Sequence, residues 1–340
     1  MASMANIRDV ARQAGVSIAT VSAALNRSGT VSEKTLRRIL DAVDAVGYAP
    51  NGIARSLRMG RSQLFGLIVS EITNPFFGTL TRAIEKAAHD AGYAVIICNS
   101  DEDEARELEL LELLRVQRVA GVILSPSGQG TAYREKLTRE IGAPLITIDR
   151  RIEGLDRDFI GLDNRAAGRM ITEYVLRLGH RRIAFIGGRA GLSTSDERYQ
   201  GFCEALHDIG LQPDPAICLR ADFRGEAAYM VAQPLLSGRN RPTAIVAANN
   251  VMALGALQAI GDLGFRCPQD ISLAAIDDFP WSTALRPRLT AIAQPIEEMG
   301  RIAVDYLLDR VGEIETVPAA RSQIFAPTLI ARDSCVALEQ

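Results

Sequence analysis

The sequence has little that would suit a membrane-spanning or a secreted protein. No apolar run approaches the roughly 18 residues that a membrane span needs, and residues 1–12 lack the apolar stretch of a secretory signal. The five cysteines are scattered and none belongs to a CxxC pair, which argues against a zinc site or a disulfide framework. We therefore expect a cytoplasmic chain without a membrane partner.

Signals of catalysis are also missing. The three histidines, His89, His180 and His207, lie in patterns typical of a protein surface. The chain has no GxSxG motif, no P-loop and no metal-ligand spacing, and its glycines at 187, 188 and 191 are too loosely spaced for a dinucleotide fingerprint. We expect no enzymatic activity, no metal and no cofactor.

Length and charge divide the chain into unequal parts. Its 340 residues suit two or three domains, and the hydrophobic share of 47% is ample for a large core. The net charge is −3, but residues 1–60 hold eight Lys/Arg and four Asp/Glu, so this segment carries +4 and the remainder −7. A small basic module on a larger acidic body is typical of a DNA-binding head attached to a body that does not bind DNA.

Residues 6–47 hold three short helical patterns and no strand pattern. Asn6, Ser17 and Ser32 are suited to cap their N-termini, while Gly15 and Gly47 provide the turn and the helix end. The third helix is expected to bury Leu36, Ile39, Leu40 and Val43. Two capped helices joined by a glycine-containing turn indicate a helix-turn-helix.

From residue 64 onward, short apolar strands alternate with amphipathic helices, which favours parallel sheets covered on both faces. There are more such units than one sheet normally holds, so we expect two similar α/β lobes with a ligand cleft at the strand ends. The expected strands are 65–70, 93–99, 119–125, 144–149, 159–162, 183–187, 216–221, 244–248 and 271–276.

Several stretches along the chain carry a family resemblance. They are NIRDVARQAGVSIATVS (6–22), VSEKT (31–35), GYAPN (47–51), ARSLR (54–58), NPFF (74–77), NSD (99–101), MALGAL (252–257), DD (277–278) and QP (294–295). Together, and in this order, they closely resemble the LacI-type repressor family over essentially the whole chain. The resemblance implies a periplasmic-binding-protein-like body, with a head at 1–49, a hinge helix and linker at 50–62, and a ligand-binding and dimerisation domain at 63–340. The N-lobe would hold about 63–161 and 293–323, and the C-lobe about 162–292 and 324–340.

The expected DNA contacts lie in the head and the hinge. Small side chains at the start of the second helix would approach base edges, with Ile18 and Ala19 facing thymine methyl groups. The resemblance makes 51–59 a hinge helix whose Leu57 wedges open a minor-groove base step. The family usually has an arginine where this chain has Ala23, so a relaxed or changed half-site preference is expected. The full set is Ser17, Ile18, Ala19, Thr20, Ser22, Ala23, Asn26, Ser32, Thr35, Asn51, Ala54, Arg55, Leu57 and Arg58.

The expected effector contacts combine strand-end polar residues with positions that match the family. They are Phe76, Phe77, Asp149, Thr194, Arg198, Phe223, Asn249, Asp277 and Trp281. Carboxylates, an arginine and aromatic faces favour a polyhydroxylated ligand such as a sugar, with a nucleobase as the alternative. Leu192 weakens the purine reading, because the purine-binding relative has an arginine there. Asn250 stands where relatives usually have Asp, with an effect that stays open.

The resulting hypothesis is a transcriptional repressor that acts as a homodimer on a near-palindromic double-stranded operator, with an effector that shifts the angle between the lobes. A solute-binding protein is the lesser alternative. The final residues, 333–340, have no heptad run, which argues against tetramerisation through a C-terminal coiled coil, and the choice between dimer and tetramer is left open. Effector identity, inducer or corepressor action, and the operator sequence are left open.

Overall fold

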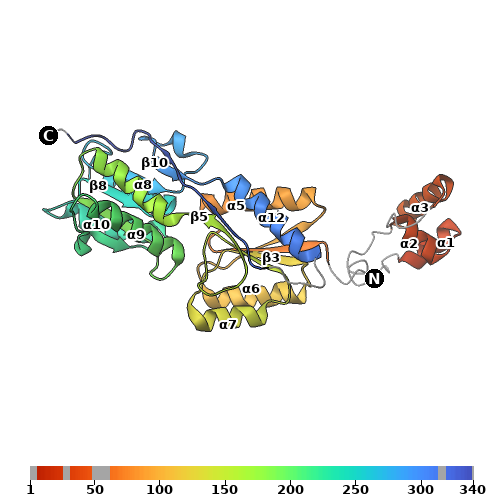
Figure 1. The fold of residues 1–340 in the computed structure, drawn as a ribbon. Helices are drawn as coiled ribbons and strands as arrows, with labels where there is room; N and C mark the ends of the chain where they lie inside the picture. The colour runs from red at the N-terminus through yellow and green to blue at the C-terminus, as the bar shows by residue number, and fades with distance from the viewer. Residues whose placement is uncertain (1–5, 26–30, 48–61, 313–318, 339–340) are drawn as a thin grey trace. The chain divides into compact units, whose positions relative to one another are not determined.

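The computed structural model of the chain describes residues 6–25, 31–47, 62–312 and 319–338 (Figure 1). They form two compact units that divide after Ser62. Residues 50–61 of the predicted hinge helix and linker (50–62) lie outside the described residues. So do Asn26, Asn51, Ala54, Arg55, Leu57 and Arg58.

The first unit contains α1 (Ile7–Ala14), α2 (Ile18–Leu25) and α3 (Glu33–Val46). The side chain of Asn6 accepts hydrogen bonds from the backbone of the first turn of α1, and the Asp9 carboxylate accepts from the Asn6 backbone, which completes a capping box. Gly15 and Gly47 end α1 and α3 with φ of 62° and 63°, left-handed values that glycine adopts without steric cost. The predicted caps and helix ends are confirmed.

The core of this unit is small and centres on three fully buried side chains, Val10, Val21 and Ile39. Leu40, which the sequence placed inward, is 47% exposed. The apolar stripe of α3 runs through Ile39 and Ala42, and Leu40 lies beyond its edge. The prediction for Leu40 was therefore wrong.

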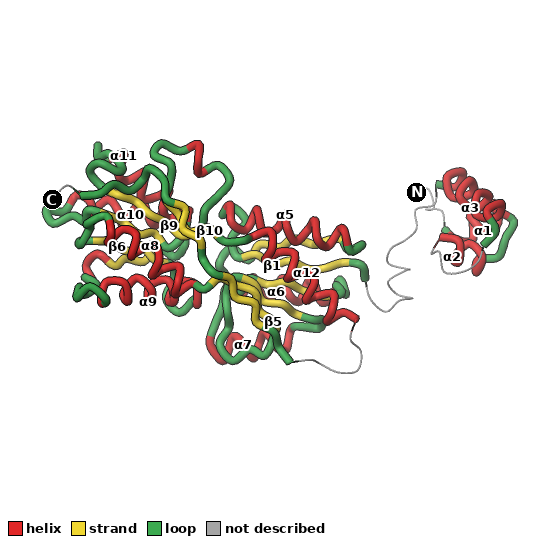
Figure 2. Tube along the Cα trace, turned by 45° about the horizontal axis from the view of Figure 1, so that its top comes forward, coloured by secondary structure: helices red, strands yellow, loops and turns green. Residues whose placement is uncertain are grey.

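The second unit contains two lobes, each built on a six-stranded sheet (Figures 1 and 2). The first sheet has the order β11-β5-β4-β3-β1-β2 and is parallel throughout. Helices α5 and α12 cover one face, and α6 and α7 cover the other. The strands are β1 (Leu64–Val69), β2 (Ala94–Asn99), β3 (Gly121–Leu124), β4 (Leu145–Ile148), β5 (Asp158–Leu162) and β11 (Ser322–Phe325); the helices are α5 (Pro75–Asp90), α6 (Glu104–Val116), α7 (Gly130–Glu140) and α12 (Ile296–Gly312).

Strand β1 shows why this sheet is buried on both faces. Phe65, Leu67 and Val69 pack toward α5 and α12, whereas Ile68 packs toward α6 and α7. Gly66 lies under Leu114 of α6, and a Cβ atom there would approach Leu114 Cδ1 to 2.5 Å. This close approach explains why a strand otherwise rich in large apolar residues contains a glycine.

The second sheet has the order β12-β10-β9-β8-β6-β7, with β12 as its one antiparallel strand among those described. Helices α8 and α9 pack together, and so do α10 and α11 (Figure 1). The strands are β6 (Ile183–Gly187), β7 (Cys218–Arg220), β8 (Ala244–Ala247), β9 (Ser272–Ile276), β10 (Thr290–Ala293) and β12 (Thr328–Ile330); the helices are α8 (Asn164–Arg177), α9 (Ser193–His207), α10 (Gly225–Ser237) and α11 (Asn250–Asp262), with short 3₁₀ turns η1 (Pro215–Ile217) and η2 (Ser282–Ala284).

The described chain passes between the lobes after β5, after β10, and between β11 and β12. The fold class expected from the sequence is confirmed, and each of the nine expected strands is present. The sequence reading missed the short strands β10, β11 and β12. Because the parallel strands of each sheet end toward the other lobe, polar residues at those ends are brought together.

Candidate functional site

A cleft of about 330 Å³, measured out to its open mouth, lies between the lobes at the strand ends. Eight of the nine predicted effector residues line it, drawn from both lobes. Sequence reasoning did not single out Glu71, Asn74, Glu102 or Arg150. The lining is Glu71, Asn74, Phe76, Phe77, Glu102, Asp149, Arg150, Thr194, Arg198, Phe223, Asn249 and Asp277.

The N-lobe wall of the cleft begins at the N-terminus of α5. Asn74 caps this helix, because its Oδ1 accepts a hydrogen bond of 2.9 Å from the backbone N–H of Phe76. The cap turns the first residues of α5 toward the cleft, where the Phe76 and Phe77 rings meet edge to face at 5.0 Å between centroids. Phe223, after β7, adds a third phenyl ring from the C-lobe.

Arg198 of α9 is the centre of the C-lobe wall and is almost completely buried. Its Nε donates to Asn164 Oδ1 at 2.8 Å, and its Nη1 donates to the Ala248 carbonyl at 2.6 Å and lies 3.4 Å from Asp277 Oδ2. Asn249 Oδ1 caps α11 by accepting from Met252 N at 2.8 Å. These bonds hold the polar lining in one arrangement before any ligand is present.

Two aspartates that directly follow strands face the cleft, one from each lobe. Asp149 follows β4 and Asp277 follows β9, and both adopt left-handed backbone angles, φ of 68° and 71°. Burial raises the pKa of Asp149 to about 6, even though the charges of Arg150 and Arg198 act to lower it. The Gln294 side chain donates a hydrogen bond to Asp277 Oδ1.

Arg150 is the most informative of the residues that the sequence reading did not select. It is not among the effector contacts expected from the sequence, and it is only 4% exposed. Its Nη1 and Nη2 bind the Glu102 carboxylate at 2.7 and 2.5 Å, and its guanidinium carbon lies 5.3 Å from the centre of the Phe223 ring. Burial raises the pKa of Glu102, but the charge and hydrogen bonds of Arg150 outweigh it and hold that pKa below 4.5.

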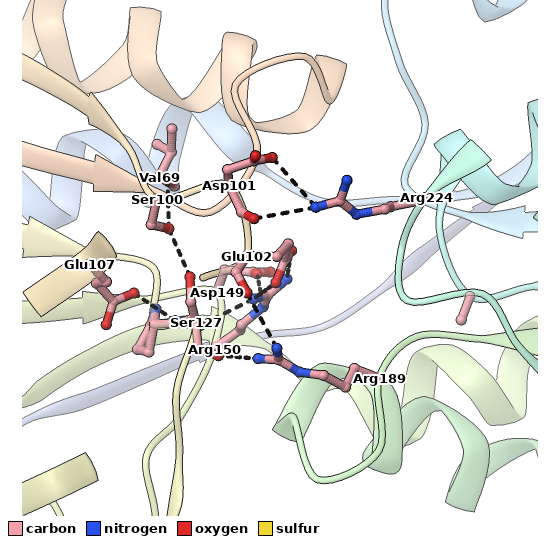
Figure 3. A network of polar contacts seen from close by, with 12 residues as sticks. Val69, Ser100, Asp101, Glu102, Glu107, Ser127, Asp149, Arg150, Arg189 and Arg224 are labelled. Atoms are coloured by element: carbon pink, nitrogen blue, oxygen red, sulfur yellow. Dashed lines mark hydrogen bonds and ion pairs between the residues drawn. The ribbon is translucent and has the colours of Figure 1, made fainter. Parts of the chain in front are cut away.

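The lobes also touch beside the cleft, as Figure 3 shows. Arg189, in the loop after β6, donates to the main-chain carbonyl of Glu102 at 3.2 Å and to the carbonyl of Ser127. Arg224, at the start of α10, lies 3.5 Å from a carboxylate oxygen of Asp101. Two arginines of the C-lobe therefore hold the loop that follows β2 in the N-lobe.

Trp281 is the predicted effector residue that the structure does not bring to the cleft. It is 47% exposed and packs edge-on against Phe279, with 4.4 Å between ring centroids. The chain turns away after Asp277, because Asp278 is held by Arg332 and by Ser282. Trp281 therefore does not belong to the described lining of the cleft.

In the head, the exposed residues at the start of α2 are Ser17, Ile18 and Ala19, with Ile18 43% exposed. Thr20 and Ala23 are partly buried. Ser22 is 7% exposed, and its contact with DNA stays a prediction.

Two predicted DNA contacts of the head also have structural roles. Ser17 Oγ accepts from Thr20 N at 3.1 Å, and Ser32 Oγ accepts from Thr35 N at 3.4 Å. Each serine thus caps the N-terminus of its helix and is itself exposed to solvent.

The sequence reading placed His180 on the protein surface, but the structure buries it. Its ring nitrogens lie 2.9 Å from Thr243 Oγ1 and 3.0 Å from the Val336 carbonyl, and burial lowers its pKa.

Within the described ranges, no group of three or more His, Cys, Asp or Glu is placed to hold a metal ion. No described helix combines the length and apolar character needed to cross a membrane.

Comparison with known proteins agrees with this architecture. The family of bacterial regulatory proteins named lacI matches residues 6–51, and the periplasmic binding protein-like domain matches residues 172–335. The ribose operon repressor of Halalkalibacterium halodurans is 35% identical over 332 residues, which is 97% of each chain. The chain belongs to the LacI family. The repressor PurR of Photobacterium profundum is 33% identical over 308 residues, 91% of this chain and 92% of PurR.

Solved structures of LacI-family members share the fold. The lac repressor dimer bound to operator and the anti-inducer ONPF has a TM-score of 0.86 and 27% identity, covering 98% of this chain and 100% of that one. The LacI family regulator of Enterococcus faecium with bound ribose has a TM-score of 0.71 and 28% identity, covering 81% and 100%. The resemblance inferred from the motifs is therefore confirmed at the level of family and fold.

Proposed function

We propose that this LacI-family regulator represses transcription by binding a near-palindromic operator in double-stranded DNA as a homodimer. A polyhydroxylated effector, a sugar or a sugar derivative, binds in the cleft and changes the affinity for DNA. The exposed start of α2 reads base edges, and the positive charge of residues 1–60 attracts the phosphate backbone. The lac repressor dimer bound to operator supports the dimeric arrangement.

The observation that carries the effector proposal is the chemistry of the cleft. Carboxylates, amides and guanidinium groups converge there beside three phenyl rings, so hydroxyl groups and apolar ring faces can both be satisfied. Arg150 Nε and Thr194 Oγ1 are buried without a hydrogen-bond partner among the described residues. Buried polar atoms are normally paired, so these two are suited to ligand oxygens.

A sugar is favoured over a nucleobase. The ribose-bound regulator of E. faecium and the ribose operon repressor of H. halodurans support a pentose. The phenyl rings could also stack on a base, and PurR is among the relatives. The Leu192 side chain has no hydrogen-bonding group, whereas discrimination among bases requires donors and acceptors aimed at the base edge.

Coupling to DNA would pass through the lobes to the hinge. Ligand that bridges the lobes changes their angle, and the hinge helix at 51–59 with its minor-groove wedge Leu57 forms or melts in response. Ligand and operator must then affect each other's affinity by the same factor.

The test uses the full chain in two assays run with the same compounds. Thermal unfolding is measured with D-ribose, other neutral monosaccharides, hypoxanthine and guanine, and operator binding is followed by fluorescence anisotropy. A neutral sugar that raises the unfolding temperature and shifts operator affinity supports the proposal. Response to a purine alone refutes the sugar assignment, and no response in either assay refutes ligand control.

A further inference from the structure

The charges that line the cleft are unbalanced. Four carboxylates face two guanidinium groups, so the lining has a formal excess of two negative charges. Each guanidinium group already lies against a carboxylate: Arg150 binds Glu102, and Arg198 Nη1 lies 3.4 Å from Asp277 Oδ2. An anionic ligand would therefore find cations that are already neutralised.

The pairing of Arg150 with Glu102 is the closer of the two. Arg150 Nη1 donates to Glu102 Oε2 at 2.7 Å and Nη2 donates to Oε1 at 2.5 Å, and Nη1 also donates to the Pro126 carbonyl at 3.1 Å. Such bidentate charge-assisted pairs are the strong ones, because two parallel hydrogen bonds add to the attraction of the charges. What remains for a ligand is Arg150 Nε, which lies 3.7 Å from Asp149 Oδ2.

A hydroxyl or ring oxygen can accept from a single Nε without bringing charge into the cleft. A phosphate or carboxylate at the same place would lie beside Asp149 and Glu102, and like charges placed side by side in an interface are strongly unfavourable. Resting on the proposed sugar-binding function, we infer that Glu102 determines specificity: by neutralising Arg150, it selects an uncharged polyhydroxylated effector and rejects the phosphorylated or carboxylated form of the same sugar.

The test compares matched neutral and anionic probes by calorimetric titration of the full chain. D-ribose is paired with D-ribose 5-phosphate and with D-ribonate, and each further neutral monosaccharide that binds is paired with its phosphate ester. We expect the wild-type chain to bind the neutral member about 100-fold more tightly. A wild-type chain that binds the anionic member equally well or better overturns the inference without any variant.

Glu102→Gln keeps the size of the side chain but frees the charge of Arg150. The contact with Arg189 is retained, because it is made by the Glu102 main-chain carbonyl. We expect the preference for the neutral sugar to fall to about tenfold or less, mainly through tighter binding of the anion. Arg150→Gln should have the opposite effect on anion binding, since it leaves Glu102 without its partner.

Glu71→Gln is the matched control. It removes one carboxylate from the lining but frees no arginine, because Glu71 Oε1 accepts from Thr73. A loss of preference in Glu71→Gln as large as in Glu102→Gln would assign the effect to total charge and overturn the role of the pair. If no neutral sugar binds the wild-type chain, the proposed function itself fails, which is distinguishable from sugar binding without charge selection.

Discussion

Glu107 should make the stability of this protein depend on pH in an unusual direction. The side chain lies on α6 and is fully buried, where it accepts a hydrogen bond of 2.7 Å from Ser127 N and contacts the Tyr133 hydroxyl. Burial outweighs the hydrogen bonds from Tyr133 and Ser127 and raises the pKa of Glu107 from 4.5 to about 7. Between pH 4.5 and about 7, the folded chain therefore keeps a proton on Glu107 that the unfolded chain has lost.

The sign and size follow from this difference. Below pH 4.5 both states are protonated at Glu107, and the residue contributes no pH dependence. As the pH rises toward 7, the folded state is progressively disfavoured, because ionisation favours the unfolded chain. At 1.36 kcal/mol for each pKa unit, the full loss is about 3 kcal/mol. Glu107→Gln, which imitates the neutral acid, should remove it.

The assay is urea unfolding of the body at pH 5 and pH 8, in which the free energy of unfolding of Glu107→Gln is compared with that of the wild-type chain. Other titrating groups cancel in this comparison, because both proteins contain them. The variant should gain about 2 to 3 kcal/mol relative to the wild-type chain at pH 8 and much less at pH 5. Glu109→Gln, an exposed position on the same helix, is the control and should show no such gain. A variant that is equally destabilised at both pH values would show that Glu107 is not held as the neutral acid.

Three further predictions concern DNA, closure and ligand. Ala23→Arg should raise the preference for guanine at one position per half-site, and identical motifs after selection from random DNA would contradict this. Arg189→Ala removes donors that join the C-lobe to the carbonyls of Glu102 and Ser127 in the N-lobe, so effector affinity should fall about tenfold in calorimetry. Trp281→Phe should leave effector affinity unchanged, because Trp281 lies outside the cleft lining.

The parts of the fold that the sequence predicted depend on local signals. Caps such as Asn6 and Ser32, glycine ends such as Gly47, and strand-helix alternation are determined by a few neighbouring residues. Strands β11 and β12 were missed because they are short and pair with strands far away in the chain. Their assignment requires knowledge of the sheet to which they belong.

The same distinction between local signals and contacts of residues far apart in the chain explains which residues of the site could be predicted. Residues directly after strands, such as Asp149 and Asp277, could be expected in the cleft, because the ends of parallel strands meet there. The burial of Arg150 could not be predicted, since its partner Glu102 lies 48 residues earlier in the chain. His180 was misjudged for the same reason: its hydrogen-bond partners are 63 and 156 residues away.

The backbone marks the cleft independently of any relative. Of the seven described residues other than glycine with positive φ, six lie in the loops directly after β2, β4, β7 and β9, and Arg118 is the exception. Such conformations cost on the order of 1–3 kcal/mol each and persist where the surrounding structure enforces them. Four of the six line the cleft: Glu102, Asp149, Phe223 and Asp277. The fold thus accepts backbone strain where side chains must turn back toward a ligand, and a substitution that relaxes one of these loops should weaken ligand binding while it stabilises the ligand-free chain.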